Sequence, residues 1–196
     1  MYYIIGLGNP GEEYKLSRHS TGRIIADDFR KSQEFGEFET NKKLSALSCE
    51  GKIKKEKLMV ILPEKYMNNS GKSVGPVIKS KKAAENLIVI HDDLDLPIGR
   101  FKISFGSGSA GHKGVESIMR AVKTKDFIRI KVGISPATHS GKIKKPQGKK
   151  VIDHILGNFK PQELKIIKKV SKKISEAMAS ILTDGLDKTM SIYCSR

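Results

Sequence analysis

The sequence contains little cysteine and no long apolar run. Its two cysteines, Cys49 and Cys194, form no C-x-x-C pair and could not supply a metal site, so we expect a reducing, cytoplasmic setting. No apolar stretch approaches the roughly 18 residues that a membrane span needs. The first residues enter a strand directly, and we therefore expect neither a membrane segment nor a signal or transit peptide.

Acidic residues are also scarce relative to basic ones. The chain has 37 lysines and arginines against 21 aspartates and glutamates, which gives a formal net charge of +16. This excess favours a polyanionic partner, with nucleic acid ahead of an anionic membrane surface, although a solvated lysine-rich surface would give the same total. The length of 196 residues fits one domain, residues 1–196, with a core of its own.

Five segments have the composition of β-strands. Residues 2–5, 58–62 and 87–90 are short runs rich in apolar, β-branched or aromatic side chains. Such runs are typical of buried strands in the middle of a sheet. Residues 100–105 and 127–134 alternate polar with apolar side chains, as half-exposed strands do.

Three segments repeat apolar residues at helical spacing. They are residues 22–29, residues 114–122 and a long segment that opens near residue 161 and stops at Gly185. Ile24 and Ile166 are among the residues expected to face inward.

The order of these elements predicts the fold class. Strands interleaved with helices indicate an α/β fold, a single globular domain with a twisted mixed β-sheet flanked by helices. Residues 141–150 combine glycine, proline and five lysines, so we expect a mobile basic loop there.

Two glycine patterns formally match the dinucleotide-binding fingerprint, Gly6–Gly11 and Gly106–Gly111. That fingerprint needs a helix that starts within the glycines, so that its first N–H groups meet the pyrophosphate. In the first copy, Pro10 and the following Glu12 and Glu13 interrupt that start and would repel a phosphate. The second copy leads into a helix but lacks a convincing ribose-binding acid. We therefore expect no nucleotide cofactor.

Histidine and serine spacing also argues against two common kinds of catalytic site. None of the histidines shows the H-x-H or H-E-x-x-H spacing of a zinc site. Neither Ser107 nor Ser109 lies in a G-x-S-x-G elbow, which weakens a serine-hydrolase interpretation. The five histidines are His19, His91, His112, His139 and His154.

Polar residues remain at the ends of the predicted strands, where α/β proteins build their sites. Asp92 follows the apolar strand 87–90, and a carboxylate bonded to a histidine Nδ1–H would leave Nε2 to take a proton from water. Asparagine side chains would then donate to the developing oxyanion. Capping of a turn by Asp92 and Asp93 stays open as the alternative. The polar residues are Asn9, His19, Met67–Asn69, His91–Asp93 and His112.

Four segments resemble, in order, the motifs of bacterial-type peptidyl-tRNA hydrolases. Residues 129–133 and 183–186 extend the similarity almost to the end of the chain. Because the matches recur in order, the resemblance is specific. The four segments are Gly6-Leu7-Gly8-Asn9-Pro10-Gly11 with Tyr14 and Arg18-His19, Tyr66-Met67-Asn68-Asn69-Ser70-Gly71, His91-Asp92-Asp93-Leu94-Asp95-Leu96-Pro97, and Gly111-His112-Lys113-Gly114.

The resemblance implies an esterase that cleaves the bond between a peptide and the terminal ribose of peptidyl-tRNA. It implies a single α/β domain, usually monomeric, that works without metal or cofactor. His19 would be the catalytic base, Asp92 its orienting partner, and Asn9 would sit at the scissile ester. Contacts to the substrate and its tRNA 3′ end are expected from Tyr14, Tyr66, Met67, Asn68, His112 and Lys113.

Three basic residues lie on the predicted strands that flank the His112 turn. Strand alternation is expected to put Lys102, Arg129 and Lys131 on one exposed face. The resemblance places phosphate contacts to the acceptor stem of tRNA there as well.

Two positions depart from the pattern of the family. Ser20 stands where the family usually has asparagine after its catalytic histidine, and Lys113 replaces the asparagine of the Gly-His-Asn-Gly turn. Lysine cannot accept a hydrogen bond, although its charge could steady an oxyanion or a phosphate. The departures keep an alternative open, a catalytically weak relative that acts as an RNA-binding, splicing-type factor. Retention of His19, Asp92 and Asn9 favours the enzyme.

Overall fold

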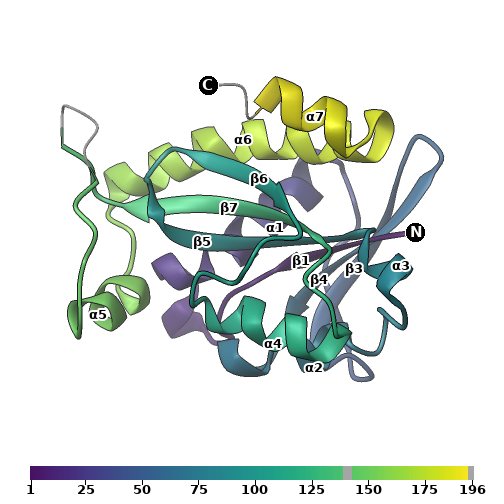
Figure 1. Cartoon of the computed structure of the whole chain (residues 1–196), viewed down its shortest axis with the longest axis horizontal. Helices are drawn as coiled ribbons and strands as arrows, with labels where there is room; N and C mark the ends of the chain where they lie inside the picture. The colour runs from purple at the N-terminus through teal and green to yellow at the C-terminus, as the bar shows by residue number, and fades with distance from the viewer. Residues whose placement is uncertain (139–142, 194–196) are drawn as a thin grey trace.

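A twisted seven-stranded sheet forms the centre of the molecule, with helices on both faces (Figure 1). The computed structural model describes residues 1–138 and 143–193. The strand order is β2-β3-β4-β1-β5-β7-β6. Strands β4, β1, β5 and β7 run parallel, whereas β2, β3 and β6 are antiparallel to their neighbours, which confirms the predicted α/β fold with a mixed sheet. The strands are β1 Tyr2–Gly6, β2 Glu39–Asn41, β3 Ala46–Ile53, β4 Glu56–Pro63, β5 Leu87–Pro97, β6 Phe101–Phe105 and β7 Ile128–Ser135.

Two layers of helices cover the central strands. Helices α1 and α6 pack on one face, and α2 and α4 pack on the other, as Figure 1 shows for α6 and α4. Within β1, Ile4 joins the first layer and Ile5 the second, because successive strand residues point to opposite faces. The α-helices are α1 Thr21–Ser32, α2 Gly71–Val74, α3 Lys81–Ala84, α4 Lys113–Val122, α5 Lys150–Leu156, α6 Pro161–Asp184 and α7 Leu186–Tyr193, and the short 3-10 helices are η1 Glu12–Tyr14, η2 Arg18–Ser20 and η3 Met67–Asn69.

Strand β5 is longer than the sequence predicts. Its apolar composition ends at Ile90, yet the strand continues to Pro97. The cause is β7, which pairs with the polar residues 91–93 after β1 has stopped pairing at Ile90. The residues that the sequence assigns to an acidic turn therefore lie on a strand that extends past the end of β1.

The alternation of residues 127–134 predicts a half-exposed strand, and this prediction is wrong for β7. Almost every residue of β7 is buried, because α6 covers one face and the glycine-rich segment 106–111 folds over the other. Arg129 is fully buried beneath that segment and donates to the carbonyl of Gly108 at 2.7 Å.

Two inward-facing predictions also need correction. Ile24 is only half-buried, and Ile166 is 39% exposed. Ile166 lies at the margin of α6 against Gly99, where the β5–β6 turn ends the sheet and leaves no further layer to cover it. Helix α6 itself ends as expected, at Gly185 with a positive φ of 91°.

The basic segment before α6 is only partly described. Residues 139–142, which include His139 and the start of the predicted mobile loop 141–150, lie outside the described residues, as does Cys194. Residues 144–149 have no helix or strand, and α5 then begins at Lys150, inside the predicted loop. Among the described residues, no helix combines the length and apolarity that crossing a membrane requires.

Candidate active site

A buried carboxylate is shared by two histidines at the end of the sheet. Asp92 on the β5 extension faces His19 from η2 and His112 from the turn before α4. The Nδ1 atom of His19 lies 2.9 and 3.0 Å from the two carboxylate oxygens, and Nε2 of His112 lies 3.0 Å from Oδ1. The three residues therefore form one hydrogen-bonded cluster, as expected for His19 and Asp92.

The tautomer of His112 follows from its position as the N-cap of α4. Its Nδ1 atom accepts the backbone N–H groups of Gly114 and Val115 at 3.2 and 3.4 Å. An N–H group can only donate, so Nδ1 carries the lone pair and Nε2 carries the hydrogen that reaches Asp92. This arrangement joins the start of α4 to the Asp92 carboxylate.

The tautomer of His19 follows from the same carboxylate. Asp92 accepts from Nδ1–H of His19, which leaves Nε2 with its lone pair. Burial opposes the charge on His19, but the charge and hydrogen bond of Asp92 outweigh it and raise the pKa of the imidazole. Burial likewise opposes ionisation of Asp92, yet the two imidazoles hold its pKa well below the usual value. A charged carboxylate thus supports a more basic imidazole.

A third histidine packs beneath this cluster. His91 donates from Nδ1 to the backbone carbonyl of Asp92 at 2.8 Å, and its ring centroid lies 4.7 Å from that of His112. Burial and the neighbouring His112 hold the pKa of His91 well below its usual value. His91 therefore stays neutral and adds no positive charge beneath Asp92.

A cavity of about 140 Å³ opens beside the three imidazoles. Residues of β5, of the turn before α4 and of α5 line it. Its wall includes Lys113 and the apolar side chains of Val151 and Ile155 from α5. The cavity gives a small reacting group access to His19.

Asn9 reaches the site through Met67. Its Oδ1 atom accepts the backbone N–H of Met67 at 2.9 Å, which makes the NH2 group the free donor end of the amide. The buried Met67 packs against Gly114, where an added Cβ would lie 2.4 Å from the methionine sulfur and 3.2 Å from the His112 ring. Met67 thus links the Asn9 amide to the turn before α4, but Asn9 itself lines a different hollow, with Leu16 and Arg23, and not the cavity beside His19.

The same cluster is the one group of potential metal ligands found among the described residues. The ligand atoms of His19, Asp92 and His112 lie within 4.8 Å of one another. A metal at Nε2 of His112 would need the hydrogen moved to Nδ1, where it would face the N–H groups of Gly114 and Val115. The N-cap therefore favours hydrogen bonding to Asp92 over metal coordination.

The N-cap His112 also bears on the second glycine pattern, Gly106–Gly111, which leads into α4. The first N–H groups of α4, which a pyrophosphate would need, already donate to His112. In the first pattern, Gly6–Gly11 leads into the short helix η1 rather than an α-helix, and its Asn9 bonds to Met67.

Three of the expected substrate contacts lie outside the cavity, whereas His112 and Lys113 line it. Tyr66 is 63% exposed, Asn68 is exposed, and Tyr14 is half-buried. None of them lines the cavity beside His19. Their roles stay predictions, because an exposed side chain takes its working position only with the substrate bound.

The three basic residues expected on one exposed face have different environments. Lys102 is exposed and pairs across the sheet with Lys131. Lys131 is half-buried, with its ammonium 3.9 Å from the Asp93 carboxylate. Arg129 lies on the same side of β7 but is fully buried under the glycine-rich segment, so its place on an exposed RNA face is wrong.

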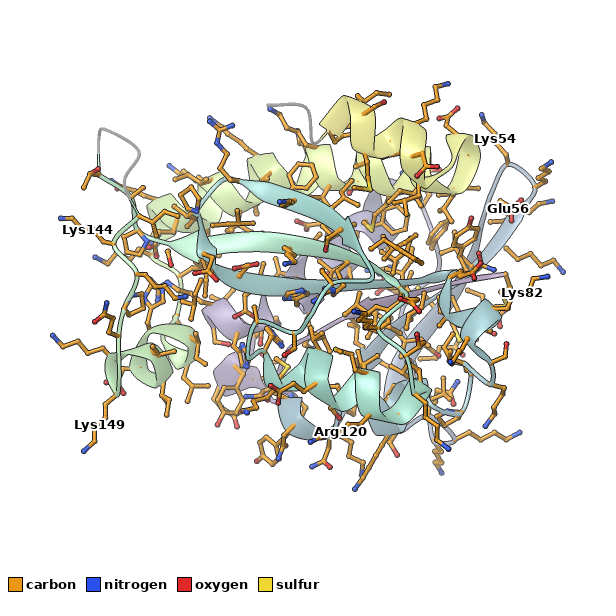
Figure 2. All side chains as sticks on the ribbon, in the orientation of Figure 1. Lys54, Glu56, Lys82, Arg120, Lys144 and Lys149 are labelled. Atoms are coloured by element: carbon orange, nitrogen blue, oxygen red, sulfur yellow. The ribbon has the colours of Figure 1, made fainter. Side chains whose placement is uncertain are left out.

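Lysines are not confined to the end of the molecule that holds the His19–Asp92–His112 cluster. Figure 2 shows Lys144 and Lys149 near α5, whereas Lys54 and Lys82 project from the opposite end of the molecule. The net charge of +16 therefore does not by itself locate an RNA-binding face.

The two departures from the family pattern lie on different sides of the cluster. Ser20 is buried and accepts a hydrogen bond from Ser17 at 3.1 Å. Lys113 lines the cavity, but its ammonium pairs with Glu116 at 3.2 Å and its side chain is 69% exposed. The positive charge is thus held along α4.

Some contributors to the site carry no motif. Val151 and Ile155 line the cavity, although the sequence reads as a loop up to Lys150. Their spacing of four, repeated in Ile152 and Leu156, is the signal that would have indicated a helix.

Comparison with known proteins places this geometry in a family. The peptidyl-tRNA hydrolase family profile matches residues 3–196. The chain is 37% identical over 191 residues to the peptidyl-tRNA hydrolase of Geotalea uraniireducens, covering 97% of this chain and 94% of that protein. It is 40% identical over 189 residues to that of Dehalococcoides mccartyi, covering 95% and 96%.

A solved structure gives the same relation. The crystal structure of peptidyl-tRNA hydrolase from Acinetobacter baumannii superposes with a TM-score of 0.84 at 28% identity, covering 97% of this chain and 93% of that one. Sequence and structure therefore agree over nearly the whole length. The chain belongs to the peptidyl-tRNA hydrolase family.

Proposed function

We propose that this protein hydrolyses the ester bond between the peptide and the terminal ribose of peptidyl-tRNA, releasing free tRNA and free peptide. The observation that carries the proposal is the buried Asp92 carboxylate bonded to Nδ1 of His19. That contact leaves the lone pair of Nε2 as the base, in a family whose named relatives are peptidyl-tRNA hydrolases.

The proposed reaction needs only water and the ester. Nε2 of His19 takes a proton from water while the water oxygen attacks the ester carbonyl carbon. The tetrahedral intermediate then breaks the bond between that carbon and the ribose oxygen, and the imidazolium returns its proton to the leaving oxygen. The products are a carboxylic acid and a ribose hydroxyl, so atoms and protons balance.

Two charges develop in this step, on the imidazole and on the ester oxygen, and each has a group to stabilise it. Asp92 supports the imidazolium that forms at His19 and is itself held by His112. The free NH2 end of Asn9 serves as the donor to the oxyanion, since its Oδ1 is engaged by Met67. Asp92 and His112 are in place before substrate arrives, which lowers the reorganisation that the reaction requires, whereas Asn9 lies outside the cavity and meets an ester that extends beyond it.

Recognition of tRNA falls to side chains around the cavity. Exposed Tyr66 offers an aromatic surface for stacking a terminal base, and exposed Asn68 offers hydrogen bonds. Lys113 and Lys102 offer positive charge to the phosphates of the 3′ end and the acceptor stem. A substrate from translation accords with the cytoplasmic setting expected from the sequence, and we propose that the protein acts as a monomer.

The alternative of a catalytically weak RNA-binding factor has less support. A binding protein has no need of a buried carboxylate shared by two imidazoles, because keeping such a charge buried is costly. The named relatives at 37% to 40% identity are hydrolases over nearly the same length.

One assay separates the two functions. Purified protein is incubated with a peptidyl-tRNA that carries an N-blocked amino acid, and ester cleavage and tRNA binding are measured for the wild type and His19→Ala. We expect wild-type cleavage and, in the variant, a loss of about 10²–10⁴-fold with binding retained. Wild-type protein that binds tRNA without cleaving it would support the RNA-binding factor. Near-wild-type cleavage by the variant would remove His19 from the mechanism.

A further inference from the structure

The residue before the catalytic base is a buried arginine with an unusual set of partners. Arg18 donates from Nη2 to the carboxylate of Glu163 in α6 at 2.7 Å. Its Nη1 atom donates to the backbone carbonyls of Gly157 at 3.2 Å and His154 at 3.4 Å, at the end of α5. The guanidinium thus joins η2 to two segments more than 130 residues away in the chain.

The backbone beside Arg18 makes the same connection. The N–H of Arg18 donates to Gly157 and the N–H of Phe159 donates to Leu16, both at 3.0 Å. The guanidinium carbon lies 5.5 Å from the centre of the Phe159 ring. Space at Gly157 is tight, because an added Cβ would lie 2.9 Å from the backbone carbonyl of Asp153 and 3.2 Å from Nη1 of Arg18. The end of α5 is therefore fitted closely to the turn that carries His19.

Helix α5 has little else to hold it. None of its residues is fully buried, and the half-buried Ile155 is its contact with the main hydrophobic core. A further hydrogen bond comes from His154, whose Nε2 donates to the backbone carbonyl of Ile134 at 3.0 Å. Yet Val151 and Ile155 of α5 form one wall of the cavity beside His19. The position of that wall therefore rests on the Ile155 contact and on polar contacts, most of them at the end of the helix.

We infer that Arg18 is a positioning residue that fixes the α5 wall of the catalytic cavity to the turn bearing the base. A cation suits this place, because the carbonyls at a helix C-terminus carry partial negative charge. The neighbouring His19 keeps its own hydrogen bond to Asp92, so Arg18 acts on the shape of the cavity and not on the ionisation of the base. This inference rests on the proposed function for its kinetic consequence.

The chain supplies a matched control in Arg30. Arg30 is also buried, also donates to two backbone carbonyls and to carboxylates, and also lies over an aromatic ring, that of Phe38 at 5.3 Å. Its partners lie at the far end of α1 and do not line the cavity beside His19. Replacing Arg30 costs a comparable set of contacts without touching α5.

The test compares Arg18→Met, Arg18→Lys and Glu163→Gln with Arg30→Met. Hydrogen exchange of the α5 amides is measured together with kcat and KM at temperatures of equal folded fraction. We expect faster α5 exchange in Arg18→Met but not in Arg30→Met. We also expect a loss of about 10–100-fold in kcat/KM, carried mainly by KM, with partial rescue in Arg18→Lys. Glu163→Gln should change α5 exchange and kcat/KM in the same direction but less. It tests the role of Arg18 if Arg18→Met does not fold.

Two outcomes would overturn the role of Arg18 as a positioning residue. One is unchanged α5 exchange in Arg18→Met and Glu163→Gln, and the other is an equal loss of kcat/KM in Arg18→Met and Arg30→Met. An unaltered pH–rate profile in Arg18→Met is expected, and a shifted one would contradict a role through cavity shape. Failure of the wild type to cleave peptidyl-tRNA would reject only the proposed function. Hydrogen exchange tests the link between Arg18 and α5 without any substrate.

Discussion

The two halves of the proposed site differ in how they are held. His19, Asp92 and His112 are largely buried and joined by hydrogen bonds of 2.9 to 3.0 Å. The residues expected to meet the tRNA, such as Tyr66 and Lys102, are exposed. The buried half is organised before substrate arrives, whereas we expect the substrate to order the exposed half. Changes in the first should therefore affect kcat, and changes in the second should affect binding and its dependence on salt.

The largest effect is expected from Asp92→Asn. The amide keeps the shape but loses the charge that supports the imidazolium and raises the pKa of His19. The rate should fall by about 10²–10⁴-fold. Because the base must be neutral, activity rises with pH through the pKa of His19, and this acidic limb should move to lower pH in the variant. A pH–rate profile measures both effects, and an unchanged profile would reduce Asp92 to a structural residue.

Changes at His112 should separate its two roles. His112→Ala removes both the donor to Asp92 and the N-cap of α4, so it should lower kcat by about tenfold or more and stability by about 1 kcal/mol. His112→Asn restores a favoured N-cap residue without the imidazole donor, so stability should recover while kcat stays low. Urea unfolding and single-turnover rates measure the two. Full recovery of kcat in the asparagine variant would show that His112 serves only as a cap.

A smaller effect is expected at the exposed lysine of β6. Lys102→Ala should weaken tRNA binding, and the slope of log K against log salt should fall by about one unit, with kcat and stability unchanged. Arg129→Met is the contrast, since its buried guanidinium holds the segment over β7 and its loss should appear as reduced stability. An unchanged salt slope in Lys102→Ala would place the RNA elsewhere.

The smallest effect is expected at Lys113. Its ammonium is exposed and paired with Glu116, and the pKa of His19 is governed by burial and by Asp92. Lys113→Asn and Lys113→Ala should both stay within about threefold of the wild type in kcat, because exposed ion pairs are weak. Rates at saturating substrate measure this. A tenfold gain in the asparagine variant would mean that the ammonium leaves Glu116 and impairs the base.

Much of the buried half was predictable from short-range patterns. Apolar runs indicate the central strands, the polar residues that follow them indicate the candidate site, and the family resemblance pairs His19 with Asp92. The turn between β3 and β4 gave no such signal, because Lys54 adopts a positive φ of 51° where hairpins usually have asparagine or glycine. The edge of the sheet that β2 and β3 form was therefore not predicted.

Long-range contacts account for two further errors. Arg129 alternates as an exposed strand residue should, and only the folding of segment 106–111 over β7 buries it. Strand β5 extends past its apolar residues because β7 pairs with residues 91–93. Both contacts are between segments distant in sequence, so the local periodicity of either segment does not predict them.

The central claim is that Asp92 holds His19 with Nδ1 protonated and Nε2 free as the base. Long-range ¹⁵N–¹H NMR spectra of the histidine rings test it directly, with assignments from His19→Ala and His112→Asn. Above the pKa of His19, we predict the Nδ1–H tautomer for His19 and the Nε2–H tautomer for His112. An Nε2–H tautomer at His19 would contradict the account, because the proposed base would then hold its hydrogen where the water must give one up.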